Sequence, residues 1–318
     1  MAGVRRTLAV DLGGWILPTP VMIASGCAGT GRELAGLTDT RRVGAIVTRS
    51  ITLHPRKGDP TPRIGESPSG ITWATGMQNP GIEGFLQEEL PRLARAGTSL
   101  MVSITGGSLE EFVRLSSLLQ NRPDVSAIEL RLSEPDEEMG RPMLGAHHDR
   151  AVEIVGAVAR MSLVPVFAKV PAAVGDPVEL ARAAVRAGAH GLTLQDSPAA
   201  MGVDAGSLKP SLGPVTGWLS GPALKPVTIR VVFEVARALP DVPIVAVGGV
   251  RSGRDAVELL LAGAWAVQVG TATLIDPAAP VEVARGIAAY LKEKRIASPG
   301  ELRGRLRTPP ALSAGALP

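Results

Sequence analysis

The sequence predicts one α/β domain over residues 1–318, a (β/α)8 barrel of the TIM type that begins with a short hairpin at residues 8–20. Three observations support this prediction. Short apolar segments recur eight times, helical patterns lie between most of them, and the eight units occupy about 250 residues, the usual size of such a barrel. Apolar strands covered by helices form a parallel sheet that is buried on both faces.

The eight expected strands share an almost continuous apolar character and end at polar residues or glycines. They are Val21–Gly26, Ala45–Ser50, Ser99–Thr105, Ala127–Ser133, Pro165–Val170, Gly191–Asp196, Pro243–Gly249 and Ala266–Ala272. The expected helices lie at 31–37, 85–96, 109–119, 150–161, 178–187, 226–239, 255–263 and 281–295. An open doubly wound sheet is the alternative, but it usually begins with a glycine-rich turn after its first strand. Here the glycine pairs come at the other end of the chain.

Two long segments, 54–81 and 197–225, interrupt this alternation. The first is rich in Pro, Gly and Ser. Loops of this length in a compact domain are usually functional. We therefore expect them to contribute to a site at the mouth of the barrel.

The composition is that of a globular protein with a substantial core, since 45% of the residues are hydrophobic and 20% are charged. The net charge of +3 comes without a cluster of Lys and Arg, which argues against a nucleic-acid partner. A single cysteine, Cys27, excludes internal disulfides and suits a reducing cytoplasm. No segment has the length and apolarity of a signal peptide or a membrane span. We expect a cytoplasmic protein that binds neither nucleic acid nor membrane.

Glycines at the ends of the last two strands predict a phosphate site. Gly248 and Gly249 follow the seventh strand, and Gly270 and Thr271 follow the eighth. In barrels of this class, the loops after these two strands often bind phosphate through backbone N–H groups. Lys169 is a charge inside the apolar fifth strand, and a lysine is almost never buried without a partner. We interpret it as a cation facing the barrel mouth, close to an electron-rich cofactor ring.

Several motifs in one order resemble the FMN-dependent dihydroorotate dehydrogenases of the soluble class 1 type, most of all the class 1B flavin subunit. They are ASGCAG at 24–29, TLHPRKGDPTPRIGESPSG at 52–70, GMQNPG at 76–81, SGPALKPV at 220–227 and VGGVRSGRDAVELLLAGAWAVQVGTA at 247–272. The resemblance covers nearly the whole chain. It implies FMN-dependent oxidation of dihydroorotate to orotate in pyrimidine biosynthesis.

The resemblance also implies roles for individual residues. The two glycine motifs would hold the FMN phosphate, and Lys169 would stabilise the reduced flavin ring. The implied flavin contacts are Ala24, Ser25, Lys169, Ser197, Gly221, Gly248, Gly249, Gly270 and Thr271.

The substrate-binding positions depart from the family pattern. The family motif Asn-x-Ser-Cys-Pro-Asn, whose cysteine is the catalytic base, corresponds here to residues 131–136, so Glu134 stands at the base position. A family lysine corresponds to Arg49. Family asparagines that contact orotate correspond to Trp73, Arg131, Asp136 and Asp196, and a flavin-contacting asparagine corresponds to Ser103.

These replacements predict a pocket that disfavours an anion. A carboxylate at about 4 Å from the orotate carboxylate costs on the order of 4 kcal/mol at an effective dielectric constant near 20. We expect Arg49, Arg131, Glu134, Asp136 and Asp196 to pair with one another, and the indole of Trp73 to fill substrate space. His147 and His148 lack a third metal ligand, so we predict no metal site and a helix capped at Asp149.

The sequence therefore favours a diverged paralogous subunit, accessory and weakly or non-catalytic, that forms a heteromer with a complete dihydroorotate dehydrogenase chain. The family resemblance implies a dimer or a higher oligomer. The alternative is an FMN-dependent oxidoreductase that acts on a different small-molecule ring with Glu134 as the base. A raised carboxyl pKa beside apolar walls would suit that base.

Overall fold

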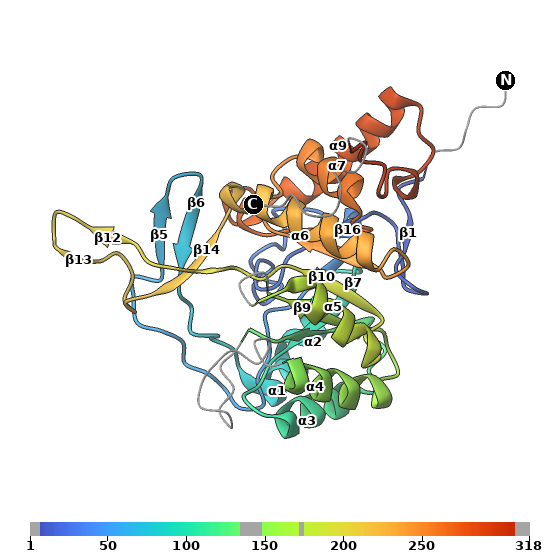
Figure 1. Ribbon diagram of the computed structural model, residues 1–318. Helices are drawn as coiled ribbons and strands as arrows, with labels where there is room; N and C mark the ends of the chain where they lie inside the picture. The colour runs from blue at the N-terminus through green and yellow to red at the C-terminus, as the bar shows by residue number, and fades with distance from the viewer. Residues whose placement is uncertain (1–6, 134–147, 172–174, 309–318) are drawn as a thin grey trace.

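The computed structural model describes residues 7–133, 148–171 and 175–308 (Figure 1). Eight parallel strands form a closed barrel in the order β10-β15-β16-β3-β4-β7-β8-β9. Their bounds are β3 (Val21–Ile23), β4 (Ala45–Val47), β7 (Ser99–Ile104), β8 (Ala127–Arg131), β9 (Val166–Val170), β10 (Gly191–Leu194), β15 (Ile244–Val247) and β16 (Ala266–Val269). The expected (β/α)8 barrel is confirmed.

Helices cover the outside of the barrel (Figure 1). They are α1 (Gly81–Gly84), α2 (Leu90–Ala94), α3 (Leu109–Leu119), α4 (His148–Met161), α5 (Pro177–Arg186), α6 (Lys225–Ala238), α7 (Gly253–Ala262), α8 (Thr271–Ile275) and α9 (Ala279–Lys294). A π-helical turn, η2 (Phe85–Glu89), joins α1 to α2, and the 3-10 helices are η1 (Thr40–Arg42), η4 (Pro222–Leu224) and η5 (Pro299–Glu301). The longest helix reaches 16 residues. Among the described residues, none of the helices is long and apolar enough to cross a membrane.

Side-chain caps explain where several helices begin. The Ser108 hydroxyl accepts from the backbone N–H of Glu111 at the start of α3, and Asp176 caps α5 in the same way. Ser252 and Asp255 form a reciprocal capping box at α7. Each cap satisfies backbone donors that have no partner within the helix. The cap expected at Asp149 is wrong in position, because α4 already begins at His148 and Asp149 lies in its first turn.

The helix expected at residues 31–37 is wrong. This segment forms turns, and Gly31 and Gly36 have φ values of +87° and +81°. Both values lie in the left-handed region that a right-handed helix excludes. The apolar spacing around Leu34 therefore reflects one buried side chain beneath a turn and no helical face.

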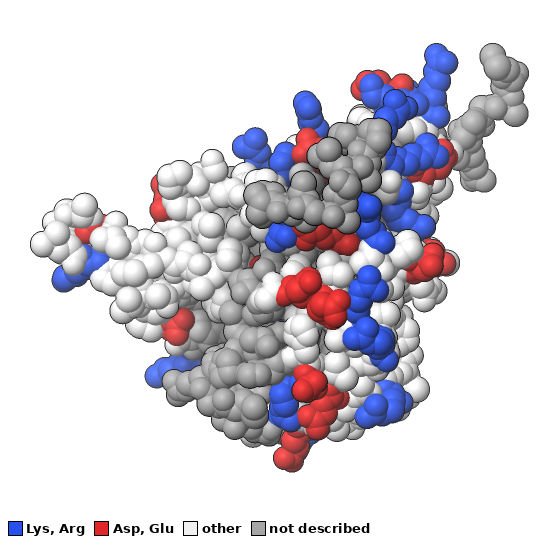
Figure 2. Space-filling view, viewed as in Figure 1, with Lys and Arg blue, Asp and Glu red and all other residues white. Residues whose placement is uncertain are grey.

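The two long segments form a second sheet beside the barrel mouth. Its antiparallel order is β11 (Ala199–Ala200), β14 (Gly217–Ser220), β6 (Gly70–Trp73) and β5 (Ile64–Ser67). A projecting hairpin, β12 (Val203–Asp204) and β13 (Lys209–Pro210), extends from it at the left of Figure 1. This part of the molecule is mostly uncharged at its surface, whereas Lys and Arg mix with Asp and Glu over the helices (Figure 2).

The opposite end of the barrel is closed by the N-terminal hairpin β1 (Val10–Asp11) and β2 (Ile16–Leu17). Leu12, Trp15 and Leu17 are buried against inward-facing residues of the barrel strands. The Trp15 and Phe167 rings meet edge to face, with centroids 6.0 Å apart. A larger apolar cluster fills the space between the barrel and its helices. Stability is concentrated in these two layers, which leaves the C-terminal mouth for a site.

Candidate functional site

A cavity of about 480 Å³ lies at the C-terminal mouth of the barrel, between the strand ends and the second sheet. Ser103 is fully buried on β7 and does not line it, whereas the other predicted site residues that the structure describes do. These are Ala24, Ser25, Arg49, Trp73, Arg131, Lys169, Asp196, Ser197, Gly221, Gly248, Gly249, Gly270 and Thr271. Glu134 and Asp136 lie outside the described residues. Residues from strands far apart in the chain are therefore brought to one cavity.

One end of the cavity is built from glycine turns. Gly249 has a φ of +84°, and a Cβ atom added there would lie 2.5 Å from the backbone nitrogen of Lys225. Gly248 has a φ of +120°, and its added Cβ would lie 2.7 Å from Thr228 Oγ1. The turn after β15 thus packs against the start of α6 with no room for a side chain. Its backbone is left facing the cavity.

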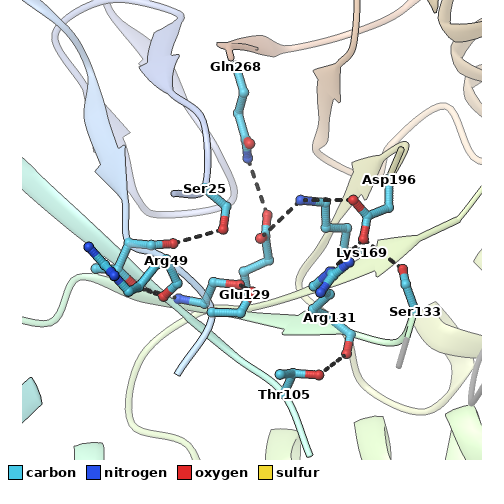
Figure 3. Close-up of polar contacts among 12 residues, drawn as sticks. Ser25, Arg49, Thr105, Glu129, Arg131, Ser133, Lys169, Asp196 and Gln268 are labelled. Atoms are coloured by element: carbon cyan, nitrogen blue, oxygen red, sulfur yellow. Dashed lines mark hydrogen bonds and ion pairs between the residues drawn. The ribbon is translucent and has the colours of Figure 1, made fainter. Parts of the chain in front are cut away.

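The other end of the cavity holds a buried ion pair. Arg131, the last residue of β8, places Nε 2.7 Å from Oδ2 of Asp196, which follows β10 (Figure 3). Their side chains are only 5% and 8% exposed. The Ser133 hydroxyl donates to the same oxygen at 2.7 Å, and the Ser197 N–H donates to Oδ1 at 2.9 Å. The Asp196 carboxylate is therefore held in place by Arg131, Ser133 and Ser197.

The charge of Asp196 is fixed by its neighbours. Burial alone raises the pKa of a carboxyl group, but the Arg131 guanidinium and the Lys169 ammonium outweigh it and lower the pKa of Asp196 well below its usual range. Asp196 is consequently a carboxylate at neutral pH. It cannot act as a proton donor there.

Lys169 is a buried ammonium that lines the cavity and is short of hydrogen bonds. Its Nζ lies 3.6 Å from Oε1 of Glu129 and 3.9 Å from Oδ1 of Asp196 (Figure 3). In the part of the chain that the structure describes, Nζ makes these two ionic contacts and donates no hydrogen bond of ordinary geometry. Because buried polar groups are normally hydrogen-bonded, Lys169 is poised to donate to a ligand in the cavity.

Glu129 and Gln268 complete this polar cluster inside the barrel. Both side chains are fully buried, and Gln268 Nε2 donates to Glu129 Oε2 at 3.2 Å. Oε1 of each residue lacks a hydrogen-bond partner among the described residues. Neither residue was predicted to belong to the site. Each is a polar residue inside an apolar strand, which is the same signal that identified Lys169.

A wall of aromatic rings faces the ion pair. Trp73 of β6 and Trp218 of β14 are paired in register, and their ring centroids lie 6.4 Å apart. The Arg131 guanidinium lies 5.7 Å from the Trp218 ring centroid, a cation–π contact. Met77 contacts the same guanidinium. Trp218 was not predicted, because only the antiparallel pairing of the two long segments brings it beside Trp73 and Arg131.

The expected pairing among the charged residues holds for Arg131 and Asp196 but is wrong for Arg49. Arg49 Nε lies 3.7 Å from Glu89 Oε2, and Nη1 donates to the carbonyl of Gln78 at 3.2 Å. Glu89 belongs to the π-helical turn η2 outside the barrel mouth. Arg49 is therefore turned toward the helical layer and away from Asp196.

Two other groups can be placed chemically. Burial raises the pKa of the Cys27 thiol to about 11 against the opposing field of Lys169, so Cys27 is a neutral thiol at neutral pH and a poor nucleophile. His148 begins α4. Among the described residues there is no group of three His, Cys, Asp or Glu side chains that could hold a metal ion.

Comparison with known proteins gives a consistent assignment. Residues 7–291 match the family model described as dihydroorotate dehydrogenase. The catalytic subunit of dihydroorotate dehydrogenase B (NAD(+)) from Geotalea uraniireducens is 42% identical over 304 residues, covering 96% of this chain and 99% of that protein. The corresponding subunit from a Geobacillus species is 40% identical, covering 94% and 95%.

A solved structure, DHODH from Eimeria tenella in complex with ferulenol, is similar with a TM-score of 0.77 and 21% identity. The match covers 94% of this chain and 88% of that chain. This likeness agrees with the barrel fold. On the family match and the identity to the bacterial subunits, the chain belongs to the dihydroorotate dehydrogenase family.

Proposed function

We propose that this chain is an FMN-binding member of its family that no longer uses dihydroorotate as a substrate. In this proposal it is a weakly or non-catalytic paralogous subunit of pyrimidine biosynthesis, which assembles with a catalytically complete dihydroorotate dehydrogenase chain in the cytoplasm. The observation that carries the proposal is the buried Arg131–Asp196 ion pair in a cavity that is otherwise suited to a flavin.

The cavity suits FMN at both of its ends. Its volume of about 480 Å³ falls in the range of cofactor sites. At one end, Gly248 and Gly249 present backbone where a Cβ atom has no room, which allows close approach of a phosphate. At the other, the Lys169 ammonium needs a hydrogen-bond acceptor, and the flavin ring offers several.

The chemistry would be divided between cofactor and protein. FMN, when bound, supplies a two-electron acceptor for oxidation of a ring substrate. Gly248, Gly249, Gly270 and Thr271 would hold its phosphate. Lys169 would hold positive charge at the ring, and the Trp73–Trp218 wall would exclude water from the mouth.

The ion pair argues against dihydroorotate as the substrate. Arg131 donates to Asp196, so its charge is already neutralised inside the cavity. The formal charges of four side chains, Glu129, Lys169, Asp196 and Arg131, add up to zero. An anionic substrate therefore gains no net attraction from them. Taken alone, the Asp196 carboxylate at about 4 Å from a substrate carboxylate would cost on the order of 4 kcal/mol, and Arg131 and Lys169 offset part of this repulsion.

A heteromeric partner accounts for a family member with an altered substrate site. The bacterial relatives are named catalytic subunits, a name that implies a further subunit in those enzymes. We propose that the present chain pairs with a related barrel that keeps the intact Asn-x-Ser-Cys-Pro-Asn loop, as a dimer or a higher oligomer.

A second candidate is an FMN-dependent oxidoreductase for a different small ring, with Glu134 as the base. The open cavity beside two indole rings favours it, because planar ligands stack on such walls. A cationic or neutral ring would suit the Asp196 carboxylate better than an anion does.

The test uses the purified full chain, loaded with FMN and titrated with orotate while the flavin absorbance is followed. We expect a yellow protein with no saturable response to orotate and no flavin reduction by dihydroorotate. The double variant Arg131→Asn/Asp196→Asn should gain orotate affinity at least tenfold, about 1.4 kcal/mol.

Three results would contradict parts of the proposal. Colourless protein after incubation with FMN would contradict flavin binding. Turnover of dihydroorotate by the unaltered chain would contradict the loss of that substrate. Isolation of the co-expressed chain only as a homodimer, in the presence of a complete family member, would contradict the heteromer. Flavin reduction by another cyclic substrate would select the second candidate.

A further inference from the structure

Four buried charges at the barrel mouth form a quartet with no net charge. Glu129, Lys169, Asp196 and Arg131 follow one another as alternating signs, with separations of 3.6, 3.9 and 2.7 Å between their nearest charged atoms (Figure 3). The side chains of all four are at most 8% exposed. Water therefore screens them weakly, and removing one charge changes the local field strongly.

We propose that the Arg131–Asp196 ion pair sets the reduction potential of a flavin bound in the cavity, by determining how much of the positive charge of Lys169 acts on the ring. The inference rests on the proposed binding of FMN. It names a role for the ion pair that is independent of which substrate, if any, reduces the flavin.

The charge of the flavin ring changes when the ring is reduced. Taking up two electrons and one proton converts a neutral flavin ring into a ring with one negative charge. A positive environment favours this product and raises the reduction potential, and a negative environment lowers it. In the present protein, Lys169 lies between two carboxylates, and Arg131 in turn lies against one of them. The quartet therefore has no net charge, and the field at the ring depends on how its four charges are arranged.

Asp196 and Arg131 are the members of the quartet whose charges are best suited to substitution. Both line the cavity together with Lys169. Glu129 lies deeper, is fully buried, and receives a hydrogen bond from Gln268. Burial opposes the charged form of Asp196, but the Arg131 and Lys169 charges lower its pKa, so this carboxylate keeps its charge across the neutral range.

Opposite substitutions in the pair should move the potential in opposite directions. Asp196→Asn leaves the quartet with a charge of +1, and Arg131→Gln leaves it with −1. Asparagine keeps Oδ1 as the acceptor for the Ser197 N–H, and its Nδ2 can donate to the Ser133 hydroxyl, which then accepts; both exchanges keep the loop in place. A purely structural disturbance has no reason to produce two effects of opposite sign.

The experiment measures the midpoint potential of the FMN-loaded full chain by equilibration with reference dyes during reduction by dithionite. We expect Asp196→Asn to favour the reduced flavin at least tenfold, about +30 mV for a two-electron couple, and Arg131→Gln to disfavour it by a similar factor. The double variant Arg131→Gln/Asp196→Asn should return within threefold of the unaltered protein. Arg41→Gln is the control, because the Arg41–Asp39 pair has a similar separation of 2.8 Å but is exposed.

Shifts of the same sign in both single variants, or shifts below threefold, would overturn the inference. Yellow protein with unmoved potentials would overturn the inference alone and leave the proposed flavin binding standing. Colourless protein after incubation with FMN would overturn both. The orotate titration is a separate readout, so loss of substrate binding and control of potential are tested independently.

Discussion

The two ends of the cavity are built in different ways. The glycine end is defined by backbone positions, and each position can be judged by itself from its φ value and the space around it. The charged end is defined by a set of side chains that are stable only together. A substitution at the glycine end should therefore have a local effect. The effect of a substitution at the charged end should be offset by a second substitution that removes the opposite charge. The following predictions test this difference.

The largest effect is expected from breaking the buried pair on one side. Asp196→Ala removes the carboxylate that lies 2.7 Å from Arg131 Nε, and removal of one partner from a buried pair typically costs about 3–5 kcal/mol of unfolding free energy. Urea denaturation checks this. The compensated variant Arg131→Met/Asp196→Leu should recover most of the loss, because neither charge then remains. A loss in the double variant equal to the sum of the losses in Asp196→Ala and Arg131→Met would show that the two residues act separately.

A smaller and uncompensated effect is expected at the glycine end. Gly249→Ala places a methyl group against the Lys225 backbone in a left-handed conformation, and should cost about 3 kcal/mol and reduce FMN affinity at least tenfold. Gly14 has a similar φ of +97° but nothing within 4 Å of an added Cβ, so Gly14→Ala should cost only about 1 kcal/mol and leave FMN binding unchanged. Denaturation and flavin fluorescence measure both. Equal losses in the two variants would exclude the steric explanation.

The smallest effect concerns pH. The pKa of Asp196 is lower in the folded protein than in the unfolded chain, where it is about 3.9. Its stabilisation is therefore complete above that unfolded value and declines as the pH falls toward the folded pKa. At about pH 3 the unfolded chain binds a proton that the folded protein does not, so stability rises with pH by up to about 1.4 kcal/mol per unit from this group.

Denaturation of the unaltered protein and of Asp196→Asn between pH 3 and 6 isolates this contribution. The difference between their unfolding free energies should be constant near pH 6 and should shrink on acidification. A difference that grows as the pH falls would contradict the lowered pKa.

Periodicity in the sequence predicted the barrel because each strand and each helix carries its own local pattern. All eight expected strands exist, but the structural strands are shorter, as in Ala45–Val47 for the expected Ala45–Ser50. Several residues beyond the C-terminal ends of the structural strands, among them Ala24, Arg49 and Asp196, line the cavity at the mouth. The second sheet was not predicted, because the pairing of Trp73 with Trp218 joins residues 145 positions apart and neither short strand has a pattern of its own.

The sequence predicted which residues line the cavity better than it predicted what their side chains contact. A motif resemblance identifies positions, so Gly249, Lys169 and Asp196 were found at the cavity as expected. It does not give side-chain partners, and Arg49 consequently turned out to pair with Glu89. The direction of a long flexible side chain depends on neighbours from other elements, and those neighbours become known only when the chain is folded.

The hairpin under the barrel has a consequence for how the chain acquires its structure. Trp15, near the beginning of the chain, is buried in a cluster that includes Val245 and Ala266 from the last two barrel strands. During synthesis this indole lacks part of its final surroundings until the last quarter of the chain has emerged. Such long-range contacts form slowly. Trp15 is thus placed to report the last step of barrel closure, and its change in fluorescence should follow the appearance of helical signal when the denatured chain is refolded.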